Sequence, residues 1–125
     1  MNICVVPGVL KTLQLTVHER EWMKGIVLSA AYLEAYALGK LKDFFMVAGR
    51  KPFDEELEKL NFNQITVMML ALNLIDERTC REMQKVKKTR NRLIRHRVLI
   101  PKLHQRKCLH LIEDTIHILE RWGAA

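Results

Sequence analysis

Turn-forming residues are scarce in this chain: five glycines and three prolines occur among its 125 residues. A sheet built from short strands needs many turns, and glycine and proline are prominent in them. Long stretches instead carry apolar residues at the three- and four-residue spacing of an amphipathic helix. We therefore predict an all-α fold, an antiparallel bundle of four to five helices that forms one domain over residues 1–125.

Polar residues that typically cap helices mark the boundaries of these elements. Thr16 with Glu19 fits a capping box, and Asn61 with Gln64 gives the same signal. The apolar residues 1–15 precede the first of these signals and are typical of a short strand or an extended N-terminal arm. The helices are expected from about residues 17 to 49, 54 to 60, 64 to 75, 77 to 95 and 102 to 122, with Asp54 and Asp76 as further N-caps and Gly123 as a stop.

The positive charge is concentrated in one part of the chain. The formal net charge is +7, and twelve of the 21 lysines and arginines lie in the basic segment Arg78–Lys107, where Glu82 is the single acidic residue. Such a segment favours polyanions, and nucleic acid is the partner that we expect. A membrane surface fits less well, because the apolar side of the same helix is needed for the core. No apolar run reaches the roughly 18 residues of a membrane span.

The cysteines and histidines give no sign of a metal or a disulfide. Cys4, Cys80 and Cys108 form no CxxC pair, which indicates a reducing, cytoplasmic location. His104, Cys108 and His110 are close in sequence, but a structural zinc site needs four ligands and no fourth has a suitable spacing. Cys108 also fits the apolar stripe of the last helix, so we interpret it as a core residue. No cofactor motif is present, and no cofactor is expected.

Two charged residues lie on predicted apolar faces. Arg90 continues the stripe from Val86 to Leu93, where an aliphatic side chain would be expected, and Glu34 lies among apolar neighbours in an earlier helix. A buried guanidinium stays charged and needs an acid or a bound anion. One interpretation is an Arg90–Glu34 contact across the bundle. The alternative is that each residue lies at the edge of its stripe and extends to water.

Polar groups beside Arg90 suit chemistry on a phosphodiester. Asn91 and His96 follow it near the end of the helix. Arginine can hold a phosphate with two donors, and histidine can move a proton near neutral pH. RNA needs no metal for cleavage, because its own 2′-hydroxyl is the nucleophile. The solvated basic residues expected to contact RNA are Lys85, Lys88, Arg92, Arg95 and Arg97.

Two stretches of the sequence resemble the HEPN domain superfamily. The run FNQITVMMLALNLIDERTCREMQKVKKTRNRLIRH is similar to its second half, with an apolar helix, a LIDE turn and a long helix that ends in Arg-Asn and then His. The run AAYLEAYALGKLKDFF is similar to its first core helix, which has a Leu-Glu pair at the place of Leu33-Glu34. The likeness is closest to the mannitol operon repressor-like branch and spans roughly residues 20 to 100.

The resemblance implies a homodimer with a composite, metal-independent RNase site, as in toxins and defence effectors of the family. Arg90 would stabilise the phosphate, and His96 would be the general acid or base. Asn91 would hold the phosphate or position the helix end, and Glu34 would orient Arg90. Here five residues separate Arg90 from His96, whereas four is the commonest spacing, and Arg95 takes the usual histidine position. That difference favours the alternative, a non-catalytic regulator or interaction module. A cognate antitoxin, for a toxin, or a regulatory protein is a further possible partner under the family resemblance. A helix-turn-helix DNA reader is a more distant alternative.

Overall fold

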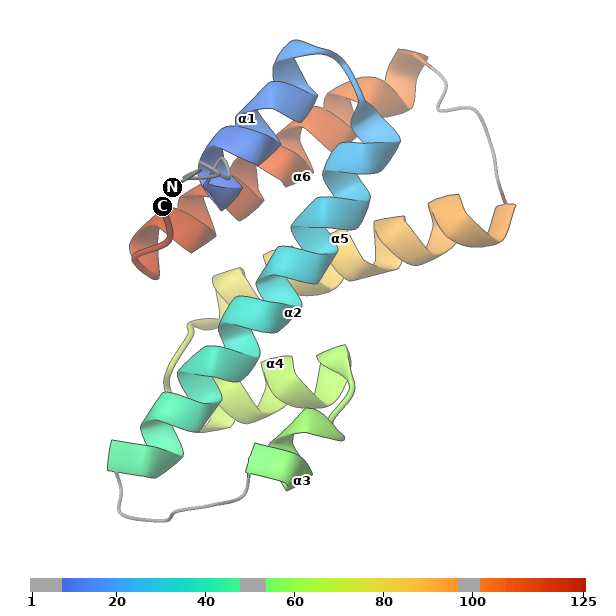
Figure 1. Ribbon diagram of the computed structural model, residues 1–125. Helices are drawn as coiled ribbons and strands as arrows, with labels where there is room; N and C mark the ends of the chain where they lie inside the picture. Colours follow the sequence, from blue (N-terminus) through green and yellow to red (C-terminus); the bar gives the residue numbers. More distant parts are fainter. Residues whose placement is uncertain (1–7, 48–53, 97–101) are drawn as a thin grey trace.

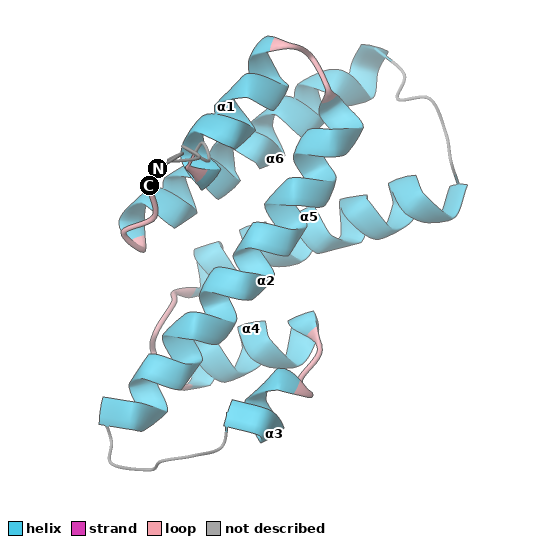
Figure 2. Cartoon of the chain, viewed as in Figure 1, coloured by secondary structure: helices cyan, strands magenta, loops and turns pink. Residues whose placement is uncertain are grey.

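The protein is all-α, as the sequence predicts. The computed structural model describes residues 8–47, 54–96 and 102–125, and these ranges contain six helices and no strand (Figures 1 and 2). The prediction is four to five helices, so the described part has one helix more than the upper number. The helices are α1 Val9–His18, α2 Trp22–Val47, α3 Asp54–Glu58, α4 Phe62–Ala71, α5 Glu77–His96 and α6 Lys102–Arg121.

The additional helix is α1, so the predicted arm or strand is wrong from Val9 onward; residues 1–7 lie outside the described part. Leu13 is completely buried, and α1 packs on α2 and α6. Thr16 lies inside α1 and donates from Oγ1 to the carbonyl oxygen of Leu13 over 2.6 Å, so it does not cap the next helix. Local sequence signals missed α1 because a ten-residue helix depends mainly on tertiary packing.

Helix α2 is the centre of the structure. It contacts each of the other five helices of the described part, and Figure 1 shows it crossing in front of α5. Its buried stripe has the spacing of one helix face, and every other helix adds at least one side chain to the same core. The buried stripe of α2 comprises Ile26, Ala30, Leu33, Ala37 and Leu41.

Three helices end with a residue in the left-handed region. Arg20, Asn73 and Gly123 have φ values of 56°, 58° and 82°. After each of them, the next backbone N–H donates to a carbonyl oxygen five residues earlier, as from Leu74 to Met69 over 2.9 Å. This arrangement satisfies carbonyl groups that a helix end leaves unpaired. The predicted stop at Gly123 is confirmed, whereas Arg20 carries no such signal in its residue type.

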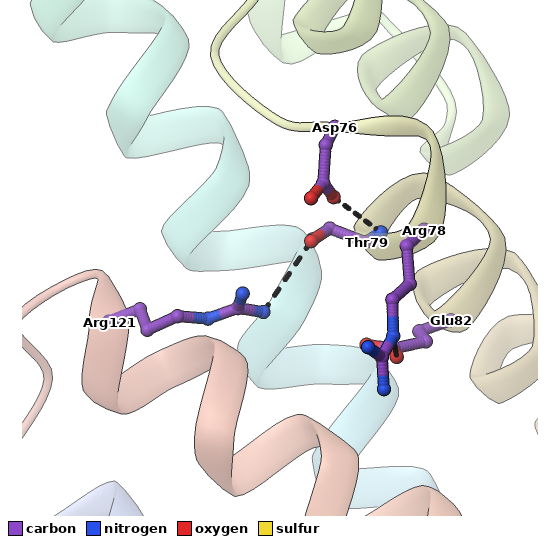
Figure 3. Close-up of polar contacts among 5 residues, drawn as sticks. All are labelled: Asp76, Arg78, Thr79, Glu82 and Arg121. Carbon is purple, nitrogen blue, oxygen red and sulfur yellow. Dashed lines mark hydrogen bonds and ion pairs between the residues drawn. The ribbon is translucent and has the colours of Figure 1, made fainter.

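Helix α5 is fixed at its start by a cap and by a contact with α6 (Figure 3). The backbone N–H of Thr79 donates to Asp76 Oδ1 over 2.8 Å, which confirms Asp76 as the cap. Hydrogen bonds from the Thr79 side chain and backbone lower the pKa of the Asp76 carboxyl below its usual value. Arg121 Nη2 donates to Thr79 Oγ1 over 3.4 Å, so the end of α6 contacts the start of α5. These contacts orient the helix that carries most of the basic segment.

Candidate nucleic-acid interface

The C-terminal half of α5 forms one wall of an open groove. The start of α4 and the middle of α2 complete it, and its volume is ≈ 670 Å³. That volume lies within the range of small-molecule sites, about 300–1,000 Å³. The groove is lined by Glu34 of α2, by Asn61, Phe62 and Asn63 at the start of α4, and by Gln84, Lys87, Lys88, Asn91, Arg92 and Arg95 of α5.

The groove has a rim of exposed basic residues and a floor of half-buried polar and charged residues. Lys88, Arg92 and Arg95 are exposed, whereas Gln84, Lys87, Asn91 and Glu34 are half-buried. Glu34 is the only carboxylate among the lining residues, beside four basic side chains. Exposed cations suit contacts to phosphate, and half-buried amides and carboxylates suit hydrogen bonds to a base.

The half-buried floor contains an ion pair that the sequence did not predict. Lys87 Nζ lies 3.6 Å from Glu34 Oε2 and 5.3 Å from the centre of the Phe62 ring. The predicted contact between Glu34 and Arg90 is therefore not formed. Lys87 precedes Arg90 by three positions, almost one helical turn, so it reaches a neighbouring part of α2. The sequence signal that could have indicated this ion pair is Glu34, a single acidic residue among apolar neighbours.

Hydrogen bonds hold the α4 side of the groove in place. Asn61 and Gln64 form the predicted capping box, in which the Gln64 backbone N–H donates to Asn61 Oδ1 over 2.8 Å. From α5, Gln84 Nε2 donates to Asn63 Oδ1 over 3.2 Å and to Thr66 Oγ1 over 3.5 Å. These hydrogen bonds connect the start of α4 to the α5 wall of the groove. The side-chain oxygen of Gln84, Oε1, remains an available acceptor.

Arg90 lies on the inner face of α5, as its spacing predicts. It continues the stripe of Met83 and Val86, which are fully buried, and its own side chain is half-buried. Its Nε is buried without a hydrogen-bond partner, and no carboxylate of the described residues forms an ion pair with it. A buried donor without an acceptor costs free energy, so this side chain has unused hydrogen-bonding capacity. Arg90 does not line the groove.

The remaining predicted residues divide into those inside the groove and those outside it. The structure brings Glu34, Lys88, Asn91, Arg92 and Arg95 together along its walls. Lys85 is exposed on α5 but does not line it. His96 is the last residue of α5, and its side chain lies outside the described part, as does Arg97. The groove residues that the sequence prediction missed are Asn61, Phe62, Asn63, Gln84 and Lys87.

The cysteine and histidine side chains of the described part do not form a cluster that could bind a metal ion. No group of three or more histidine, cysteine, aspartate or glutamate side chains within the described ranges is placed to hold an ion. Cys108 is buried, which confirms its predicted place in the core, and burial raises the pKa of its thiol. His104 and His110 are exposed.

Comparisons of the chain with protein-family models, with curated proteins and with solved structures found no match. The HEPN resemblance thus depends on the sequence runs quoted above. Across the described ranges, each helix is too short or too polar to cross a membrane.

Proposed function

We propose that this chain is a HEPN-type RNA-binding protein whose contact surface is the groove between α2, α4 and α5. The observation that carries the proposal is the gathering of Lys88, Arg92 and Arg95 on one rim, beside half-buried amides. Neutralising phosphates with such cations releases counterions, which supplies much of the affinity of a nucleic-acid-binding protein. Amides in the floor add groups that can form hydrogen bonds to bases.

Replacing the three rim residues should weaken RNA binding much more than the same loss of charge elsewhere on α5. The variant carries Lys88→Ala, Arg92→Ala and Arg95→Ala. We expect its affinity for single-stranded RNA to fall about tenfold or more at low salt. The slope of log K against log salt should become shallower by about 2, because each lost phosphate contact contributes about 0.7 for a single strand. Fluorescence anisotropy over a salt series measures both.

A matched control removes three positive charges from the same helix outside the groove. Arg78, Arg81 and Lys85 are exposed, and none lines the groove. Their joint replacement by alanine changes the net charge equally, so it should lower the affinity less and alter the slope less. Equal effects of the two triple variants would mean that RNA follows the overall charge of α5, and the groove would then not be the contact surface.

Metal-independent cleavage of RNA is a second candidate function, and the observation that favours it is Arg90. Its guanidinium is held on the inner face of α5 with a buried Nε that lacks an acceptor. In this reaction the 2′-hydroxyl attacks phosphorus, the bond from phosphorus to the 5′-oxygen breaks, and a 2′,3′-cyclic phosphate forms. His96 would take or supply a proton, and the terminal nitrogens of Arg90 would stabilise the phosphate. A composite site of this kind requires the homodimer that the family resemblance implies.

Incubation of the purified protein with mixed single-stranded RNA in EDTA tests this second function. We expect wild-type protein to yield fragments with cyclic phosphate ends, and His96→Ala and Arg90→Ala to lower the rate by about 10²-fold or more. Circular dichroism of both variants checks that they fold, and sedimentation checks the dimer. Wild-type protein that binds RNA but releases no fragments would support the non-catalytic regulator, for which another regulatory protein is the partner to seek.

A further inference from the structure

We infer that the Glu34–Lys87 pair makes the groove selective for an unpaired guanine base, an inference that rests on the proposed RNA-binding function. The pair places an acceptor next to a donor in the half-buried floor. Lys87 Nζ and Glu34 Oε2 are 3.6 Å apart, which is an ion pair but too long for a hydrogen bond. Both groups therefore keep hydrogen-bonding capacity that a ligand can use.

Both side chains are held in place yet remain accessible. Lys87 is 26% exposed and its ammonium lies 5.3 Å from the centre of the buried Phe62 ring, so a cation–π contact restricts its position. The Glu34 side chain is 42% exposed and has Lys87 as its ionic partner. Lys87 and Glu34 come from helices that cross, which fixes their relative position through the packing of α5 on α2.

The edge of a guanine base matches this order of groups. Its Watson–Crick edge presents the N1–H and N2–H donors beside the O6 acceptor. A carboxylate accepts two parallel hydrogen bonds, and a lysine donates. Glu34 can thus accept from N1 and N2 while Lys87 donates to O6. Adenine and cytosine offer the carboxylate only an exocyclic amino group, and uracil offers only its N3–H, so each forms fewer hydrogen bonds with the pair.

The surroundings of the pair suit a base that is not stacked in a duplex. Asn91 and the side-chain oxygen of Gln84 lie along the same floor and can contact the sugar or the rest of the base. The rim cations Lys88, Arg92 and Arg95 line the same groove and are available to the phosphates of a bound strand. Recognition of unpaired bases by their polar edges, with phosphates held separately, is common in RNA-binding proteins.

The test uses short labelled oligouridines with one central position varied, with affinity measured by anisotropy at fixed salt. We expect guanosine at that position to bind roughly tenfold more tightly than adenosine or uridine, and inosine to lose much of the gain, because it lacks the N2 amino group. Glu34→Gln and Lys87→Met should each abolish most of the preference for guanosine. Lys88→Ala should weaken all the oligonucleotides together and keep their order.

The outcomes separate this inference from the proposed function. Equal affinity for guanosine and adenosine, or an unchanged preference in Glu34→Gln, would overturn the guanine inference and leave RNA binding by the groove intact. Failure of the wild-type protein to bind any of these RNAs would overturn both. Circular dichroism of Glu34→Gln and Lys87→Met confirms that a lost preference does not come from a lost fold.

Discussion

Replacing Leu13 by alanine is expected to lower the free energy of unfolding by about 2–5 kcal/mol, the cost of removing a large aliphatic side chain from a packed core. Leu13 is completely buried where α1 packs against α2 and α6. The result is informative because an extended N-terminal arm would predict almost no effect. Urea unfolding followed by circular dichroism measures the difference, from the shift of the midpoint at an unchanged slope.

Leu15→Ala is the matched control on the same helix. Leu15 is 42% exposed, so the same change of residue removes far less buried surface. Its effect on the free energy of unfolding should stay within about 0.5 kcal/mol, as is usual for surface positions. Similar, small effects of both substitutions would show that α1 does not pack on the core in solution.

Alanine substitutions at two glycines of α2 are expected to change stability in opposite directions. At Gly25, an added Cβ would lie 2.5 Å from Ile112 Cδ1 and 2.8 Å from Thr16 Oγ1. Both neighbours are fully buried or nearly so, and Thr16 is held by its hydrogen bond to Leu13. Overpacking of this kind typically costs about 1–3 kcal/mol, which exceeds the roughly 1 kcal/mol gained by replacing glycine inside a helix.

Gly39 provides the comparison, because no heavy atom lies within 4 Å of the position that its Cβ would take. Gly39→Ala should therefore stabilise the protein by about 0.5–1 kcal/mol through helix propensity alone. Thermal unfolding of the two variants beside the wild type measures both effects. A stabilising Gly25→Ala would contradict the close approach of α2 to α1 and α6.

Much of the candidate site depends on information that local sequence patterns do carry. The 3.6-residue period placed Arg90 on the inner face of α5, and the structure confirms this with a half-buried side chain and a buried Nε. The cap signals at Asn61 and Asp76 were also correct, because a cap is a contact between residues three positions apart. The concentration of charge in α5 likewise follows from the sequence alone.

The partner of Glu34 could not be predicted in the same way. Periodicity predicts which face of a helix a side chain lies on. It does not predict the position along that helix at which another helix crosses. Lys87 and Arg90 lie almost one turn apart on α5, and the packing of α5 on α2 brings Lys87 to Glu34. The contribution of Asn61, Asn63 and Gln84 to the groove was missed for the same reason, since their proximity depends on the packing of α4 against α5.

The sequence by itself therefore determined the all-α class, most helix boundaries, the inner position of Arg90 and the basic character of α5, because each depends on residues close together in the chain. Only the tertiary structure decided that residues 9–18 form a helix and that Glu34 pairs with Lys87. A short helix is marginal until its apolar side is buried, and an ion pair between helices depends on where they cross. Both are consequences of packing between segments distant in sequence.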